Sequence, residues 1–397
     1  MCFVCFVGHL FRRFSTASTF ETRVIYFDHN ATTPLAPAAR DAWVRASGQF
    51  IGNPSSPHRL GARADAALAN AREEFAAHLG CHALDLVWTS GATESNNTAV
   101  HHFARTLKAT DEFWISAIEH PCLREAARFH FGKRVRVIPV TRDGVLDLAW
   151  LKKQLTKKAP GAVAVMAANN ETGVLQPWRA VLALCRERAI PFLCDAAQWL
   201  GKLPATGLGD CDFVSGCAHK FGGPKGIGFL KCPARGRVHP LLYGGPQEEG
   251  RRAGTESVAA VLAMTAALAA RAPQLTAEHL AARLKLRADF EQRLQRVVPG
   301  AEIIGAGAER LWNTVSAVMP AADCRVRWVV KLDKAGFAVS TGSACSSGKE
   351  EPSHVLAAMG YPASAAARVL RFSSGPETTA EEWTGLAEAA GKIAKAL

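Results

Sequence analysis

Lys220 is the residue of this chain whose surroundings point most directly to chemistry. It lies in the glycine-rich segment AHKFGGPKGIGF and follows the strand-like segment LCDAAQ, which contains Asp195. A lysine amine can condense with an aldehyde, and a carboxylate can keep a pyridine nitrogen protonated so that the ring accepts carbanion electrons. A pyridoxal phosphate (PLP) site needs both groups. A surface lysine beside a glycine turn has the same spacing, so the rest of the chain must decide.

Other polar residues come directly after strand-like segments. Ala92 and Thr93 would open a helix after DLVWTS, His120 follows EFWISAI, and Asn170 follows AVAVMAA. In an open parallel sheet, ligands bind beyond the carboxyl ends of the strands. The helix start would receive a phosphate, the imidazole could lie on a cofactor ring, and the amide could bond its phenolic oxygen. Loop capping explains each residue alone, but the succession favours a site.

The same edge would gather Gln198, three residues after Asp195, and His219, directly before Lys220. Together these side chains would supply a phosphate site, an amide, a carboxylate and an amine. This is the donor set of a cofactor pocket.

Two residues of the C-terminal third add a nucleophile and a cation. Cys345 lies in STGSACSSGKEEPSH among small polar residues, as expected for a loop thiol that reaches solvent. Arg371 alternates with apolar residues in VLRFSSG and could clamp a substrate carboxylate. An incidental thiol and a structural ion pair are the alternatives.

Hydrophobic periodicity predicts the elements that carry these residues. Helical and strand-like segments alternate, and the pattern predicts a largely parallel sheet with helices on both faces. We expect strands at 85–90, 112–118, 134–140, 162–168, 190–195, 212–216 and 226–231, and helices at 61–79, 92–106, from Leu148 and from Trp178.

The order of predicted helices and strands changes after Pro273. A helix over 277–297, strands at NTVSAVM, FAVST and VLRFS, a helix from Arg325 and a terminal helix predict a smaller α+β unit. We expect a poorly ordered extension at 1–22, a segment at 23–38 that packs with the small domain, a large domain at 39–272 and a small domain at 273–397.

Composition limits the classes of function. The chain has 397 residues, 48% of them hydrophobic, a net charge of +12 and no apolar run near the ~20 residues of a membrane helix. We expect a soluble protein without direct nucleic-acid binding, because no such motif accompanies the charge. An anionic cofactor or an acidic partner protein would account for the positive field.

Eleven scattered cysteines favour a reducing compartment, and the isolated pair Cys2 and Cys5 does not indicate a metal site. Residues 1–20 contain no acid and place an apolar stretch before two arginines, which disfavours export. We expect a cytoplasmic protein, and the alternative is an organelle reached through a presequence.

Taken together, these segments resemble the cysteine desulfurases of the NifS/IscS type, class V aminotransferases on PLP fold type I. The resemblance rests on motifs that occur in the family's order from about Tyr26: YFDHNATTP, GNPSSPH, SGATESNN, EHP, NNETG, CDAAQ, AHKFGGPKGIG, GGPQEEGRRAGTES, GSACSSGKEEPSH and LRFSSG. It implies a homodimer with a seven-stranded sheet in the large domain. The implied reaction is removal of sulfur from L-cysteine, which gives L-alanine and passes the sulfur to an acceptor protein for iron–sulfur assembly or thiolation.

The resemblance also implies a role for each matching position. Lys220 would bind the PLP aldehyde, His120 would stack on the ring, Asp195 would pair with the ring nitrogen, and Gln198 and Asn170 would contact the phenolic oxygen. The phosphate would be held by Ala92, Thr93 and His219, and by Thr255 from the neighbouring subunit. Arg371, helped by Asn170, would bind the substrate carboxylate, and Cys345 would accept the sulfur.

Cys217 departs from the family pattern, which has a serine three residues before the lysine as a phosphate ligand. A thiol is a poorer hydrogen-bond donor than a hydroxyl. Either cofactor affinity is lower, or Ser215 shifts to compensate.

Four other functions stay open at this level. Selenocysteine lysis and sulfinate removal use the same scaffold, and so does transamination, against which the loop cysteine argues. A catalytically silent scaffold protein is the fourth, although every catalytic position is filled.

Overall fold

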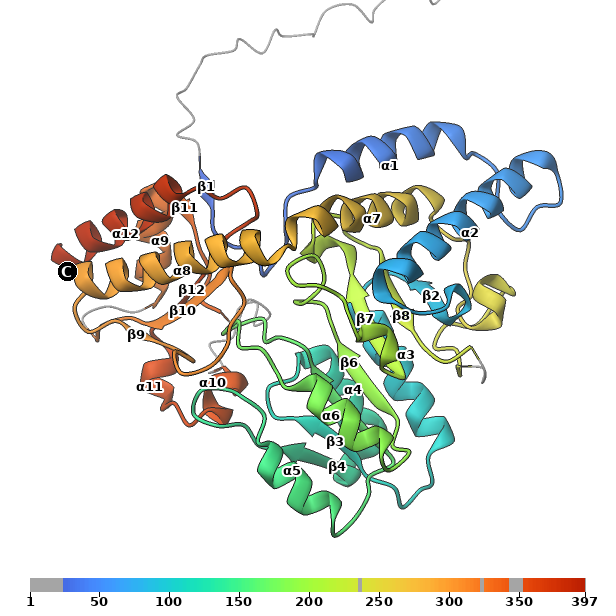
Figure 1. The fold of residues 1–397 in the computed structure, drawn as a ribbon, viewed down its shortest axis with the longest axis horizontal. Coiled ribbons are helices and arrows are strands. Elements are labelled where there is room, and N and C mark those ends of the chain that lie inside the picture. The colour runs from blue at the N-terminus through green and yellow to red at the C-terminus, as the bar shows by residue number, and fades with distance from the viewer. Residues whose placement is uncertain (1–23, 235–237, 322–324, 343–352, 397) are drawn as a thin grey trace, which may run out of the picture.

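The computed structural model describes residues 24–234, 238–321, 325–342 and 353–396 (Figure 1). The predicted extension at 1–22 and the predicted nucleophile Cys345 therefore lie outside the described residues.

The centre of the fold is a seven-stranded sheet with the order β2-β8-β7-β6-β5-β3-β4. Only β8 runs against the other strands, because it pairs antiparallel with both β7 and β2. The strands are β2 (Leu86–Thr89), β3 (Phe113–Ser116), β4 (Val135–Ile138), β5 (Ala162–Met166), β6 (Phe192–Asp195), β7 (Phe213–Cys217) and β8 (Gly228–Lys231). Each predicted strand of the first part is present, and the predicted mostly parallel sheet is confirmed.

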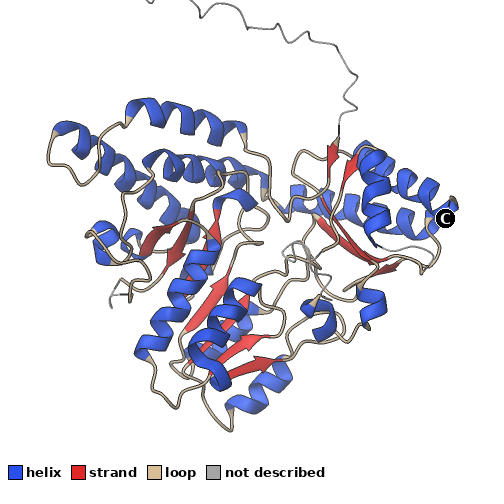
Figure 2. Ribbon diagram, turned by 180° about the vertical axis from the view of Figure 1, so that it is seen from behind, coloured by secondary structure: helices blue, strands red, loops and turns tan. Residues whose placement is uncertain are grey.

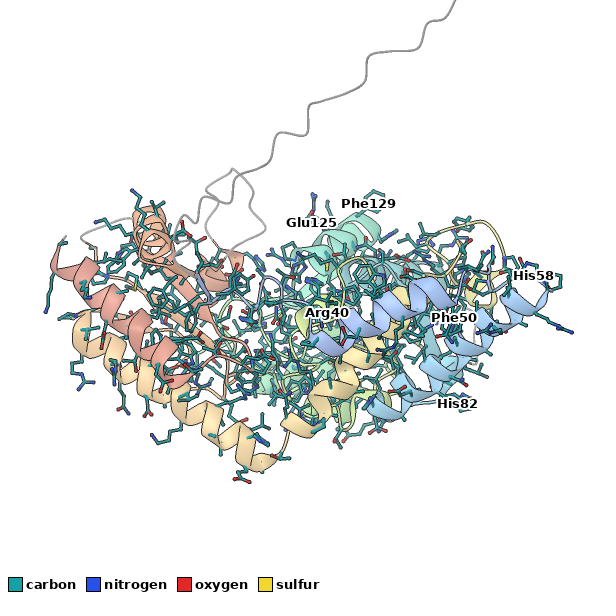
Figure 3. The ribbon with its side chains drawn as sticks, turned by 90° about the horizontal axis from the view of Figure 1, so that it is seen from above. Arg40, Phe50, His58, His82, Glu125 and Phe129 are labelled. Atoms are coloured by element: carbon teal, nitrogen blue, oxygen red, sulfur yellow. The ribbon has the colours of Figure 1, made fainter. Side chains whose placement is uncertain are left out.

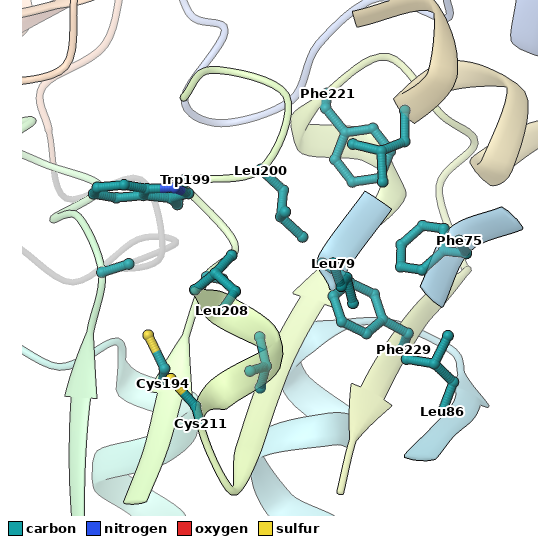
Figure 4. Packing of buried hydrophobic residues seen from close by; sticks show 14 of the residues in the cluster. Phe75, Leu79, Leu86, Cys194, Trp199, Leu200, Leu208, Cys211, Phe221 and Phe229 are labelled. Atoms are coloured by element: carbon teal, nitrogen blue, oxygen red, sulfur yellow. The ribbon is translucent and has the colours of Figure 1, made fainter. Parts of the chain in front are cut away.

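Both faces of this sheet are covered, because alternate side chains of one strand enter different apolar clusters. Val163 and Val165 of β5 belong to one cluster, whereas Ala162 and Ala164 belong to another. The first cluster, part of which Figure 4 shows, packs under five helices, and α3 (Ala92–Thr106) and α4 (Pro121–Phe131) cover the other face. The five are α1 (Pro37–Gln49), α2 (Arg59–Leu79), α5 (Leu148–Leu155), α6 (Trp178–Arg186) and α7 (Val258–Arg271).

A second, smaller layer of strands and helices lies beside the large sheet (Figure 2). Its three-stranded antiparallel sheet has the order β12-β10-β9, and β1 (Ile25–Tyr26) pairs with β11 (Phe337–Ala338). Its core joins Phe27 to Phe290 and Trp383, so the N-terminal segment packs with the C-terminal part of the chain. The other elements are β9 (Glu302–Ile303), β10 (Thr314–Val318), β12 (Val369–Ser373), α8 (Ala277–Val297), α9 (Arg325–Lys334), α10 (His354–Ala358), α11 (Ala363–Ala366) and α12 (Ala380–Lys395).

The chain passes between the two layers through a sharp bend. The helical runs Val258–Gln274 and Ala277–Val297 meet at 85°. In the described part of the chain, no single helix is long and apolar enough to cross a membrane. The two bent helical runs reach the length and apolar content of a membrane span only when they are counted as one helix. The domain boundaries stay a prediction.

Candidate active site

A cavity of about 1100 Å³ opens at the carboxyl edge of the large sheet. The predicted residues that line it are Ala92, Thr93, His120, Asn170, Asp195, Gln198, Cys217, His219, Lys220 and Arg371. The predicted gathering of polar residues at the ends of β2, β3, β5, β6 and β7 is therefore present. Thr255 is exposed in the loop before α7 and does not line the cavity.

Lys220 reaches the cavity from a short 3-10 turn, Ala218–Lys220, directly after β7. Its Nζ donates to the carbonyl oxygens of Asn30 at 2.5 Å and Ala31 at 2.8 Å. The glycines after it are required, because a Cβ on Gly223 would lie 2.5 Å from the Cβ of Ala218 and Gly222 has a φ of +95°. The turn thus presents the amine at the cavity wall.

Asp195 ends β6 and is held by neutral donors. Its Oδ2 accepts from Asn96 Nδ2 at 2.8 Å, and its Oδ1 accepts from the N–H of Ala197 at 2.9 Å. Asn96 is in turn fixed by Ser215, whose hydroxyl donates to Asn96 Oδ1 at 2.7 Å. Within the described residues no cationic side chain forms an ion pair with Asp195. A buried carboxylate without a cationic partner suits a protonated ring nitrogen.

His120 caps the N-terminus of α4, because its Nδ1 accepts from the backbone N–H of Cys122 at 3.2 Å. Burial lowers the pKa of His120, against the opposing field of Asp195. The neutral ring therefore carries its proton on Nε2. The thiol of Cys122 lies 3.0 Å from the same Nδ1 and also lines the cavity. On α4, Glu125 lines the cavity and is also exposed, and Phe129 is 83% exposed (Figure 3).

The predicted phosphate end of the cavity is formed where α3 begins. Ser90, Gly91, Ala92 and Thr93 line it, and the first N–H groups of a helix have no partner inside the helix. Cys217 ends β7 beside them, and burial raises its pKa to about 11, so it is a neutral thiol.

Two other observations concern the same end. Ser215 is fully buried, donates to Asn96 and is not among the residues that line the cavity, which argues against the alternative in which Ser215 shifts to compensate. Burial lowers the pKa of His219 to about 4, and its Nδ1 lies 3.2 Å from the hydroxyl of Thr32.

Arg371 enters the cavity from the opposite side, on β12 of the small sheet. Its Nη2 donates to Asp28 Oδ1 at 2.6 Å, and its Nη1 donates to the carbonyl oxygens of Asn170 at 2.9 Å and Gly342 at 3.1 Å. The side chain is buried, and its Nε has no hydrogen-bond partner among the described residues. Arg371 therefore forms an ion pair, which was the alternative to a substrate clamp, and its Nε is a donor without a partner among the described residues.

Both ends of the segment that contains Cys345 are held at this cavity, because Gly342, Ser353 and His354 line it. Ser353 Oγ donates to Glu171 Oε2 at 2.5 Å, and His354 Nε2 donates to the carbonyl of Glu119 at 2.9 Å.

Sequence reasoning missed several residues of the site: Asp28, Asn30, Asn96, Cys122 and Lys202. Asp28 and Asn30 belong to the motif YFDHNATTP, whose unusual run of polar residues was the available signal. Lys202 gave no signal, because a lysine after a strand is expected on the surface, whereas this one is 4% exposed.

The residues present fit PLP. The cavity is large enough for a phosphorylated pyridine ring with an attached amino acid. Lys220 can form the covalent link, Asp195 is the unpaired acid for the ring nitrogen, and the start of α3 is a site for the phosphate.

Comparisons with known proteins agree with this geometry. The family model for aminotransferase class V matches residues 25–386. A cysteine desulfurase of Klebsiella pneumoniae is 39% identical over 90% of this chain and 89% of its own length, and one of Rhodobacter capsulatus is 40% identical over 90% and 93%. The solved structure of a NifS-like protein from Rickettsia africae superimposes with a TM-score of 0.83 at 29% identity, covering 94% of this chain and 100% of that one. The chain therefore belongs to the class V aminotransferase family, among the cysteine desulfurases of the NifS/IscS type.

Proposed function

We propose that this chain uses bound PLP to remove sulfur from L-cysteine, with Lys220 as the cofactor's anchor and Cys345 as the first sulfur acceptor. The observation that supports this most strongly is one cavity lined by an amine, an unpaired carboxylate and a buried guanidinium: Lys220, Asp195 and Arg371. When bound, PLP supplies an electron sink for the substrate's Cα.

The residues divide the work. Arg371 orients the substrate by its carboxylate, helped by Asn170. Lys220, once displaced by the substrate amine, moves a proton at Cα. His120, neutral with its proton on Nε2, covers the ring, and Gln198 donates to the ring oxygen. Ala92, Thr93 and His219 hold the phosphate.

Cys345 takes the sulfur in the form of a persulfide. Its thiolate attacks the substrate sulfur, an S–S bond forms, the C–S bond breaks, and the electron pair returns to the carbon skeleton, which takes up a proton and leaves as L-alanine. The anchors at Gly342 and Ser353 support this role, because they tie the cysteine segment to the cavity rim.

The biological setting belongs to the proposal as well. We place Thr255 at the phosphate of a second subunit, and Leu242 and Tyr243, in the same connection between β8 and α7, are 42% and 79% exposed, which suits a subunit contact. The sulfur would pass to an acceptor protein for iron–sulfur cluster assembly or thiolation. Cysteines throughout the described chain are free, in keeping with the cytoplasm.

The test is an assay of alanine and sulfide released from L-cysteine by the PLP-loaded protein, with and without a thiol reductant. We expect alanine in both cases, and sustained sulfide release only with reductant, since the persulfide must be cleared. A protein that binds PLP but releases no alanine from L-cysteine contradicts the proposal.

A further inference from the structure

Lys202 is a second lysine of the site, hidden behind the cavity wall. It is 4% exposed and does not line the main cavity. It lines instead a small adjoining cavity that it shares with His29 and Lys220. A lysine buried to this degree needs polar partners.

The partners of Lys202 are amide oxygens. Its Nζ donates to Asn30 Oδ1 at 3.0 Å and to Gln198 Oε1. Among the described residues it forms no ion pair with an acid. A neutral amine has two N–H donors, and these two bonds use both.

Burial lowers the pKa of Lys202 well below its ordinary value, with further lowering by Lys220 and Arg371, while Cys217 acts in the opposite direction. Besides these three groups, His29 and Arg271 are the titratable side chains that line the small cavity with Lys202. A proton on Lys202 would therefore add a positive charge near Lys220, Arg371 and Arg271. The neutral amine is the form that these surroundings favour.

The bond to Gln198 decides how that side chain is turned. An amide has one acceptor end and one donor end, and an amine that donates to it must meet the oxygen. With Oε1 fixed on Lys202, the Nε2 end points the other way, where it donates to the carbonyl of Asn30 at 2.9 Å. Gln198 lines the main cavity, so its donor end is the end available to a ligand there.

Asn30 connects the two lysines. Its side-chain oxygen accepts from Lys202, and its backbone oxygen accepts from Lys220 Nζ at 2.5 Å. Two further bonds hold the side chain of Asn30. Asn313, which precedes β10, donates through Nδ2 to Asn30 Oδ1 at 3.1 Å. Asn30 Nδ2 donates to the hydroxyl of Thr314, the first residue of β10, at 2.9 Å. A change at Lys202 therefore reaches Lys220 through one residue.

We propose that Lys202 is a positioning residue, which turns the donor end of Gln198 toward the oxygen of the bound cofactor ring and holds Asn30 as the acceptor for the Lys220 amine. The inference rests on the proposed PLP site and adds a residue that acts through two others without touching the cofactor. Lys202 has this role because its two N–H groups donate to Asn30 Oδ1 and Gln198 Oε1, which leaves the Nε2 end of Gln198 for the cavity.

The test is a pH titration of the visible absorbance of the PLP-loaded protein. Lys202→Met removes the donor at nearly equal length, so Gln198 can turn and the ring oxygen loses its donor. We expect the titration midpoint to rise by about one pH unit, which is what one lost hydrogen bond to a charged group amounts to. Lys202→Arg keeps the donors and adds a permanent charge, so its midpoint should fall.

A double-mutant cycle locates the effect. If Lys202 acts through Gln198, Lys202→Met should change the midpoint far less in a Gln198→Met background than in the wild type. Lys231→Met is the matched control, because Lys231 is also buried, at 7% exposure, and donates to the carbonyl of Cys211 away from the cavity. Its midpoint should equal that of the wild type.

Thermal unfolding of the PLP-free proteins separates positioning from folding. Lys202→Met removes a donor from Asn30 Oδ1, which keeps Asn313 Nδ2 at 3.1 Å, and from Gln198, which can turn, so the melting temperature should fall by about 4 °C or less. A wild type that binds no PLP would contradict the proposed function. If the wild type binds PLP but the titration midpoints of Lys202→Met and Lys202→Arg are unchanged or shift in the same direction, Lys202 does not have this role. If Lys202→Met does not fold, the direction of the midpoint shift in Lys202→Arg decides.

Discussion

The cofactor side and the substrate side of the cavity satisfy their charges in different ways. On the cofactor side, the donors to Asp195 within the described ranges are neutral, Asn96 Nδ2 and the N–H of Ala197. On the substrate side, Arg371 is already paired with Asp28 at 2.6 Å. A cofactor that stays bound can pair permanently with the carboxylate of Asp195. A substrate binds anew at every turnover, and its carboxylate can replace Asp28 as the partner of Arg371.

The largest effect that separates the two sides is expected for Arg371→Lys. A lysine keeps the charge but loses the planar, two-pronged geometry that matches a carboxylate. We expect the KM for L-cysteine to rise about 100-fold, since a charge-assisted pair contributes about 2–3 kcal/mol. The measurement is steady-state kinetics alongside PLP absorbance, which should not change. A loss of PLP absorbance in this variant would mean that the two sides are not separate.

On the cofactor side, His29 lines the small cavity with Lys202 and Lys220. Replacing His29 tests whether a positive charge at this position would destabilise the fold. Burial is the main cause that lowers the pKa of His29 to about 4. The unfolded chain takes up a proton near pH 6.5 and the folded chain does not, so this contribution to stability is present above pH 6.5 and is lost as the pH falls toward 4.

The variant His29→Asn should therefore flatten the pH dependence of the free energy of unfolding by about 2 kcal/mol at pH 5 relative to pH 7. Denaturant unfolding at the two pH values measures it. His58→Asn is the control, because His58 is exposed and an asparagine can replace its cap of α2. Equal slopes for wild type and His29→Asn would show that His29 does not carry the effect.

Cys217→Ser sharpens the description of the phosphate end. The hydroxyl is a stronger donor than the thiol and fits the same buried position beside Ala92. We expect PLP to bind about three- to tenfold more tightly, the range of one net hydrogen bond. Titration of the PLP-free protein with PLP gives the affinity, and weaker binding by Cys217→Ser would contradict the assignment.

The smallest effect is expected for Asp28→Asn, which removes the charge that competes with the substrate for Arg371. If the partner is exchanged at each turnover, the KM for L-cysteine should fall about threefold, a modest part of one charge pair. A KM that rises as far as in Arg371→Lys would mean that Asp28 positions the guanidinium and does not compete for it.

The sequence predicts the cofactor side far better than the substrate side. Lys220, Asp195, His120 and Asn170 follow strands whose apolar runs are recognisable, and parallel strands bring their carboxyl ends to one edge. Among the helices without a prediction are α1 and α4, which begin at a proline, and α10 and α11, which have only five and four residues and give little periodicity.

What the sequence could not predict depends on contacts between distant segments. Asp28 meets Arg371 across 343 positions, and Asn30 meets Lys202 across 172. The spacing of residues along the chain does not predict such distant pairs. Lysine usually lies on the surface, so the sequence also offers no reason to expect a buried Lys202. The loop position of Thr255 is described, but the subunit contact predicted for it stays a prediction.

The most direct test of the central claim is the Cys345→Ala variant in its PLP-loaded form, incubated with L-cysteine. Its visible absorbance should match that of the wild type, whereas alanine formation should fall by about 100-fold or more, since the nucleophile is gone. Mass spectrometry of the wild-type protein should find one added sulfur atom on Cys345. Alanine formation at the wild-type rate by Cys345→Ala, or added sulfur on another cysteine, would contradict the assignment of that thiol as the sulfur acceptor.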